Sequence, residues 1–130
     1  MNYHAPLYDY LNKFKGNDKQ VWIESGFLHK ENGPAIICTG ERNYDIWYKK
    51  NKIHREERPA IIDYDSGSFL WLKNGVFHRD NDKPAIVFGN GDKYWMKDGV
   101  IHRENDKPAV MTDKGEYWFD NGMLYKKNVR

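Results

Sequence analysis

Four histidines each precede an acidic residue by two positions, a spacing that places an imidazole and a carboxylate on one face of a β-strand. The pairs are His29 and Glu31, His54 and Glu56, His78 and Asp80, and His102 and Glu104. Imidazole and carboxylate groups together can bind Zn²⁺. Successive histidines, however, lie a whole repeat apart, which in a sheet is roughly 10 to 14 Å, and one ion cannot span that distance. We therefore predict no metal or cofactor site, and expect each histidine to pack on an aromatic ring and donate to a carboxylate or a carbonyl.

A basic residue follows each of these histidines, namely Lys30, Arg55, Arg79 and Arg103. Three arginines in register could hold phosphate or carboxylate groups bidentately, so Arg55, Arg79 and Arg103 are candidate anion-binding residues. The favoured interpretation is structural. The side chains would lie at the edge of the core, with Arg79 opposite Leu70, and cover apolar neighbours with their aliphatic stems.

Five tryptophans, at positions 22, 47, 71, 95 and 118, precede these histidines, or Tyr125 in the last case, by seven residues. Such a row could stack bases in a single-stranded nucleic acid, but regularly spaced tryptophans in an array more often pack between repeats. The chain has no nucleophile elbow, phosphate loop, cysteine-pair metal motif or dinucleotide fingerprint. We therefore expect a protein that is not an enzyme.

The tryptophan spacing of 25, 24, 24 and 23 residues marks an internal repeat. A two-residue turn lies midway between each tryptophan and its histidine, as in Asn74-Gly75 and Asp98-Gly99. Such dipeptides favour a type I′ hairpin turn, which sets Trp71 opposite His78 and, in the last unit, Trp118 opposite Tyr125. The same register puts five apolar pairs on one face, which we interpret as the core: Ile23/Leu28, Tyr48/Ile53, Leu72/Phe77, Met96/Ile101 and Phe119/Leu124. The tryptophans and histidines share the other face.

A third strand opens with Pro-Ala in each of the first four units, at 34–38, 59–63, 84–88 and 108–112. The predicted fold is all-β, an antiparallel meander of about four and a half hairpin repeats of ~24 residues, with two to three strands per unit in an open or curved sheet. Leu7, Leu11 and Phe14 have helical spacing, so residues 1–20 are expected to form a short N-terminal cap. Residues 21–130 would form the repeat domain, and the whole chain a single domain.

Composition limits the class of protein. The chain has 21 basic and 19 acidic residues and a net charge of +2, far from the excess of a dedicated nucleic-acid binder. The single Cys38 cannot form an intrachain disulfide and suits a reducing compartment. The sequence has neither an apolar run long enough for a membrane span nor a signal pattern. We expect a cytoplasmic protein, in the host cytoplasm if it is viral, that does not associate with membranes.

The pattern Trp-x-x-x-Gly-x-x-His-Arg followed by Pro-Ala, clearest in residues 71–85 and 95–109, resembles the MORN-like β-hairpin repeats. These include proteins described as antitoxin components, and closely similar repeats occur in proteins of bacteriophages and large DNA viruses. The resemblance covers roughly residues 20–127. It implies a hairpin-repeat sheet that acts as a binding or scaffold module, with no catalytic residues to carry over.

The sequence thus predicts a non-enzymatic, phage-like repeat module that binds a protein partner and inhibits it. Aromatic and basic side chains are common at interface hot spots. The candidate partner-binding residues are Trp47, Trp71, Trp95, His54, His78, His102, Lys73 and Lys97. The alternative is a module that sequesters a nucleotide or another small anion between repeats, with Arg55, Arg79, Arg103 and aromatic side chains. Unpaired sheet edges also allow self-association.

Overall fold

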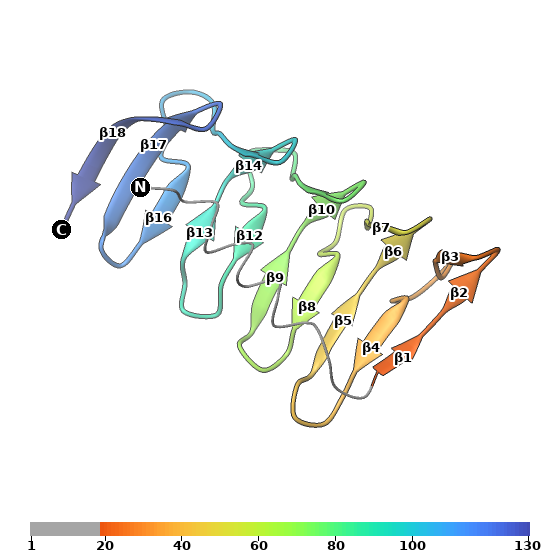
Figure 1. Ribbon diagram of the computed structural model, residues 1–130. Coiled ribbons are helices and arrows are strands. Elements are labelled where there is room, and N and C mark those ends of the chain that lie inside the picture. The colour runs from red at the N-terminus through yellow and green to blue at the C-terminus, as the bar shows by residue number, and fades with distance from the viewer. Residues whose placement is uncertain (1–18) are drawn as a thin grey trace.

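The computed structural model of the protein describes residues 19–130, which form an all-β fold with no helix in that range. Ten strands lie side by side in one antiparallel sheet (Figure 1). In spatial order they are β1 (Lys19–Val21), β4 (Ile36–Cys38), β5 (Tyr44–Ile46), β8 (Ile61–Asp63), β9 (Ser68–Leu70), β12 (Ile86–Val87), β13 (Lys93–Tyr94), β16 (Val110–Thr112), β17 (Gly115–Asp120) and β18 (Met123–Val129). The cap predicted for residues 1–20 lies outside the described residues, except that Lys19 and Gln20 belong to β1.

Four two-stranded hairpins project from one end of this sheet. They pair β2 (Ile23–Glu24) with β3 (Phe27–Leu28), β6 (Tyr48–Lys49) with β7 (Lys52–Ile53), β10 (Leu72–Lys73) with β11 (Val76–Phe77), and β14 (Met96–Lys97) with β15 (Val100–Ile101). Both central turn residues have positive φ, for example 49° at Asn74 and 84° at Gly75, as a type I′ turn requires. The five predicted apolar pairs are confirmed as cross-strand neighbours.

The first four tryptophans separate the sheet from the hairpins. The Trp71 N–H donates to the Ala85 carbonyl at 2.7 Å, and the Trp71 carbonyl accepts from the His78 N–H at 3.1 Å. The chain therefore passes at Trp71 from a sheet strand into a hairpin. Each of the first four units contributes two strands to the sheet and two to a hairpin, rather than two to three strands to one meander. The Pro-Ala segments supply β4, β8, β12 and β16, as predicted.

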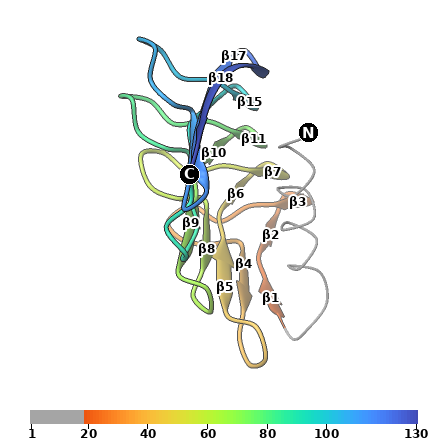
Figure 2. The ribbon, with the colours of Figure 1, turned by 90° about the vertical axis from the view of Figure 1, so that its left-hand side faces the viewer.

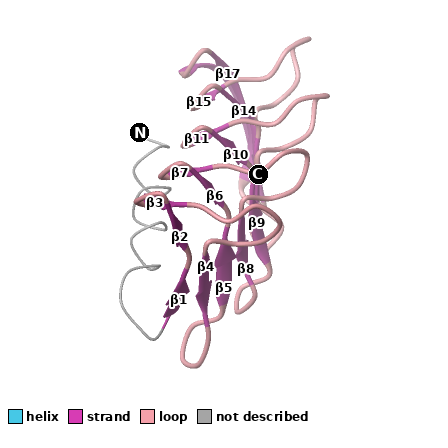
Figure 3. Ribbon diagram, turned by 90° about the vertical axis from the view of Figure 1, so that its right-hand side faces the viewer, coloured by secondary structure: helices cyan, strands magenta, loops and turns pink. Residues whose placement is uncertain are grey.

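Seen along the sheet, the hairpins leave it on one side and the connections from histidine to proline leave it on the other (Figures 2 and 3). We call these connections, residues 30–33, 55–58, 79–83 and 103–107, the link loops. The hairpins are also joined to one another, because a turn N–H donates to a carbonyl of the preceding hairpin. Examples are Gly75 to Ile53, Gly99 to Phe77 and Gly122 to Ile101, each at 2.8 Å.

One apolar core joins the sheet to the hairpins. Ile61, Leu70 and Ile86 from the sheet are at most 1% exposed and belong to the same cluster as Leu72 and Ile101 from the hairpins. The predicted core face is thus confirmed for the central units. In the first unit, by contrast, Ile23 of the predicted core pair is 66% exposed.

The last unit differs from the others, since β17 and β18 continue from the sheet into the hairpin. A register shift between Trp118 and Phe119 places Trp118 opposite Lys126. The predicted pair of Trp118 and Tyr125 is therefore wrong. A β-bulge adds one residue to one strand, and nothing in the turn dipeptide signals it.

No helix among residues 19–130 has the length and apolar character needed to cross a bilayer.

Candidate functional site

Each tryptophan carries a cation on its ring. The guanidinium carbons of Arg55, Arg79 and Arg103 lie 3.8, 3.7 and 3.9 Å from the ring centroids of Trp47, Trp71 and Trp95. Lys30 over Trp22 and Lys126 over Trp118 make the same contact at 3.7 and 4.4 Å. The predicted place of Arg79 opposite Leu70 is wrong, because Leu70 pairs with Ile61 and Ile86. The strand break at Trp71 moves the arginine out of that register.

The arginines are held by a second contact in addition to the ring. The Nη1 of each donates to the carbonyl of the proline that ends its link loop, at 3.1 Å from Arg55 to Pro59 and 3.0 Å from Arg79 to Pro84. Arg103 donates to Pro108 in the same way, at 2.9 Å. One face of each ring is therefore covered by the cation, and Trp95 is only 8% exposed.

The histidines join successive hairpins, which the sequence did not predict. Nδ1 of His54 accepts from the Asn74 N–H, Nδ1 of His78 from the Asp98 N–H and Nδ1 of His102 from the Asn121 N–H, each at 3.0 Å. An Nδ1 that accepts is unprotonated, so the neutral ring carries its proton on Nε2.

The predicted histidine–carboxylate pairs are present. Nε2 of His54 lies 2.8 Å from Glu56 and that of His78 lies 2.8 Å from Asp80, while His29 and His102 reach their acids at 3.0 Å. These hydrogen bonds lower the pKa of all four carboxyl groups below their ordinary values. Two candidate residues reach the same acids, since Lys73 lies 3.4 Å from Asp80 and Lys97 lies 4.0 Å from Glu104.

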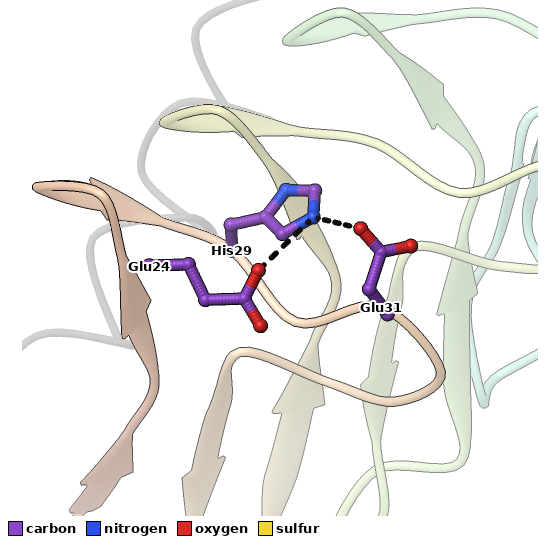
Figure 4. Close-up of side chains that lie close together, drawn as sticks. All are labelled: Glu24, His29 and Glu31. Atoms are coloured by element: carbon purple, nitrogen blue, oxygen red, sulfur yellow. Dashed lines mark hydrogen bonds and ion pairs between the residues drawn. The ribbon is translucent and has the colours of Figure 1, made fainter.

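The first unit has a glutamate, Glu24, where later units have these lysines. Glu24, His29 and Glu31 converge there, with Glu24 at 3.7 Å and Glu31 at 3.0 Å from His29 Nε2 (Figure 4). A metal would need the Nε2 lone pair. Because the Lys50 N–H donates to His29 Nδ1, the ring presents an N–H to the two carboxylates instead. This tautomer favours hydrogen bonding over metal coordination.

The link loops also make contacts between units. The carboxylate of Asp82 accepts hydrogen bonds from Arg103 Nε at 2.8 Å and from Lys107 Nζ at 3.0 Å. The main-chain carbonyl of Asp82 accepts a hydrogen bond from Trp95 Nε1 at 3.1 Å. Arg103 and Lys107 hold the pKa of Asp82 at about 2. Asp106 repeats part of this pattern, since its carbonyl accepts from Trp118 Nε1 at 3.0 Å and its carboxylate from the Tyr125 hydroxyl at 3.0 Å.

A partly exposed apolar stripe crosses the sheet on the side of the link loops. Cross-strand pairing puts eight residues in one row: Ile37, Asp45, Ile62, Phe69, Val87, Lys93, Met111 and Glu116. We call the surface that bears this row the link face. Phe69 is 39% exposed and its ring centroid lies 6.4 Å from that of Trp71, so the stripe adjoins the tryptophan row.

Sequence reasoning missed this stripe, although a signal was present. Neighbouring strand residues point to opposite faces, so consecutive apolar residues such as Ile61-Ile62 or Ile86-Val87 place one side chain in the core and the other on the link face.

Comparison with known protein families, curated proteins and solved structures finds no match for this chain.

Proposed function

We propose that the protein is a non-enzymatic repeat module that binds a protein partner through the link face. One observation carries the proposal, namely the apolar row from Ile37 to Met111, which is broken by Asp45 and Lys93 and ends at Glu116. Apolar side chains among charged ones are typical of an interface that forms and dissociates. The stripe adjoins the candidate residue Trp71, whose ring centroid lies 6.4 Å from that of Phe69. We assign the candidate residues Trp47 and Trp95 to the same surface by the repeat.

The other candidate residues take supporting parts in this proposal. The histidines hold the hairpins in place, and Lys73 and Lys97 lie at the hairpins with their acids, where they would act at the rim of an interface. Rim charges affect the association rate more than the affinity.

In keeping with the repeat pattern, we place the module among phage-like inhibitors that act in the cytoplasm. The thiol of Cys38 is only 1% exposed, which suits a buried residue in a reducing compartment.

The test compares two substitutions of equally exposed apolar residues on opposite sides of the sheet. Phe69 on the link face is 39% exposed, and Val76 on a hairpin is 41% exposed. A partner captured by the wild type should be identified, purified and titrated against Phe69→Glu and Val76→Glu variants that remain folded. We expect Phe69→Glu to weaken binding at least about 30-fold, as for a hot spot of about 2 kcal/mol, with Val76→Glu close to the wild type. Equal affinities for the two variants would exclude the link face.

A second function, anion sequestration by the three arginines, is favoured by one observation only. Arg55 and Arg79 have no carboxylate within ion-pairing distance among the described residues, in contrast to Arg103.

A further inference from the structure

Link loop 55–58, which lies beside Trp71, is one residue shorter than link loop 79–83, which lies beside Trp95. Pro84 follows His78 by six positions, but Pro59 follows His54 by only five. In the longer loop, Asn81 and Asp82 both have positive φ, at 65° and 54°. In the shorter loop only Glu57 does, at 61°, and the Arg58 N–H turns back to the Glu56 carbonyl at 2.7 Å. The residue equivalent to Asp82 is therefore absent from the shorter loop.

Asp82 satisfies two donors of the following unit at once. Its carboxylate accepts from Arg103 Nε at 2.8 Å and from Arg103 Nη2 at 3.3 Å. Its main-chain carbonyl accepts from Trp95 Nε1 at 3.1 Å. A single aspartate residue thus pairs with an arginine and the tryptophan beneath it.

The same two donors lack these acceptors one unit earlier. Arg79 donates through Nη1 to Pro84, and no carboxylate in residues 19–130 forms an ion pair with it. The Trp71 Nε1 is buried and has no hydrogen-bond acceptor in the described part of the chain. A buried N–H without an acceptor costs about 1–3 kcal/mol, so an outside acceptor that reached the Trp71 N–H would recover that cost.

Trp71 and Arg79 both line a hollow of about 450 Å³ between the second and third link loops. Four cations line it, Arg55, Lys73, Arg79 and Lys83. Three carboxylates line it too, those of Glu56, Glu57 and Asp80. Glu56 is hydrogen-bonded to His54, and Asp80 to His78 and Lys73. The Glu57 carboxylate forms no ion pair among the described residues. Burial lowers the pKa of the Arg79 guanidinium, as expected for a cation with no anion beside it.

We propose that this hollow binds an aspartate residue of the protein partner. The aspartate carboxylate would lie against Nε and Nη2 of Arg79, as Asp82 lies against Arg103, and its main-chain carbonyl would accept the Trp71 N–H. The site rests on the proposed function, because the contact between Phe69 and Trp71 places it beside the apolar stripe. The partner would therefore present an aspartate next to apolar side chains.

The first test uses small probes and needs no partner. N-acetyl-aspartate N-methylamide is titrated into the full chain while the Nε–H signals of the arginines and the indole N–H signals of the tryptophans are followed by NMR. We expect saturable shifts at Arg79 and Trp71, none at Arg103 and Trp95, and none with the asparagine analogue. Equal binding of acetate or inorganic phosphate would make this a general anion site and overturn the proposal.

The second test fills the hollow from within. Replacing Glu57-Arg58 by Asn-Asp-Lys copies the longer loop, so an internal aspartate should compete with the probe and abolish the shifts. If that variant does not fold, Arg79→Lys should weaken probe binding about tenfold, since lysine cannot make the bidentate contact. Unchanged probe binding in either folded variant would overturn the site. A partner that binds the loop copy as well as the wild type would also exclude the aspartate site. The link-face proposal would remain intact if Phe69→Glu still weakened binding at least about 30-fold.

Discussion

An arginine above a tryptophan ring recurs in three units, and its geometry explains the choice of residue. A planar guanidinium can lie flat on the indole while its edge donates to the proline carbonyl. Lysine keeps only the charge over the ring, as Lys30 does over Trp22 at 3.7 Å. The arginine thus joins the start of each unit to the end of its link loop.

Removal of one such arginine should show how much the stack contributes. Arg103→Ala loses the ring contact, the bond to Pro108 and the pair with Asp82. We expect its free energy of unfolding to fall by about 2 kcal/mol. Arg103→Lys, which keeps the charge over the ring, should lose less. Urea denaturation measures both, and equal losses for the two variants would exclude a part for the cation on the ring.

Asp82 makes one part of the stability depend on pH. Arg103 and Lys107 lower its pKa from 3.8 to about 2. Because the pKa in the folded state is below that in the unfolded state, the contribution is complete above pH 3.8 and is lost as the pH falls through 2.

We therefore expect Asp82→Asn to lower the free energy of unfolding near neutral pH by up to about 1 kcal/mol, as for a partly exposed ion pair. The difference from the wild type should shrink toward pH 2. Urea denaturation of both proteins across that range checks this. A difference that does not depend on pH would assign the effect to packing instead.

At the scale of elements, the histidines determine how one hairpin is placed on the next. His78 Nδ1 accepts from the Asp98 N–H, so loss of the ring leaves a turn N–H without that acceptor. His78→Leu should cost about 1–3 kcal/mol. His78→Asn, whose Oδ1 can replace Nδ1, should cost less, whereas His78→Gln should not recover the loss. Thermal or urea unfolding of the three variants gives the order, and His78→Gln as the most stable would contradict the part assigned to Nδ1.

Gly89 allows the main chain of its turn to lie close to that of the turn at Ser66. A Cβ on Gly89 would clash with the main-chain carbonyl of Ser66, and Gly89 N–H donates to Ser68 Oγ at 3.0 Å. Gly89→Ala should therefore destabilise the fold by about 1–3 kcal/mol, the cost typical of overpacking.

The control for Gly89→Ala is Gly26→Asn. It places asparagine in an open hairpin turn at φ 80°, as Asn51 already stands in the equivalent turn at 68°. It should be within about 0.5 kcal/mol of the wild type. Comparable losses for the two variants in urea would exclude the clash as the cause.

The hairpins were predictable because their turns are local. Asn74-Gly75 and its equivalents determine the register without help from distant residues. The strand break at Trp71, the bulge at Trp118 and the cation over each ring depend on contacts outside the hairpin turn, which a turn dipeptide does not encode. About half of the candidate site could be predicted from the sequence for the same reason. The pair of His78 and Asp80 is local, whereas the difference between Arg79 and Arg103 appears only when the contacts of two link loops are compared.

At the scale of the whole molecule, each unit contacts mainly its neighbours. The sheet order follows the chain, and the hairpin bonds run from each unit to the next. Stability in such an array is close to a sum of unit and interface terms. A defect in an end unit should then act locally, and a defect in a central unit should act in both directions. The free edge β18, exposed along its length, carries Lys126 and Lys127, charges that oppose pairing with another strand.

Two core substitutions test this difference. Phe119 in the last unit is 3% exposed and Leu72 in a central unit is 2% exposed, and truncation of either to alanine should cost about 2–5 kcal/mol. Phe119→Ala should raise amide hydrogen exchange in β16, β17 and β18 and leave the first units protected. Leu72→Ala removes the contact between two halves of the array, so exchange should rise in units on both sides of β10. If both variants raised exchange uniformly, the chain would unfold as one cooperative unit and the description as independent neighbours would be wrong.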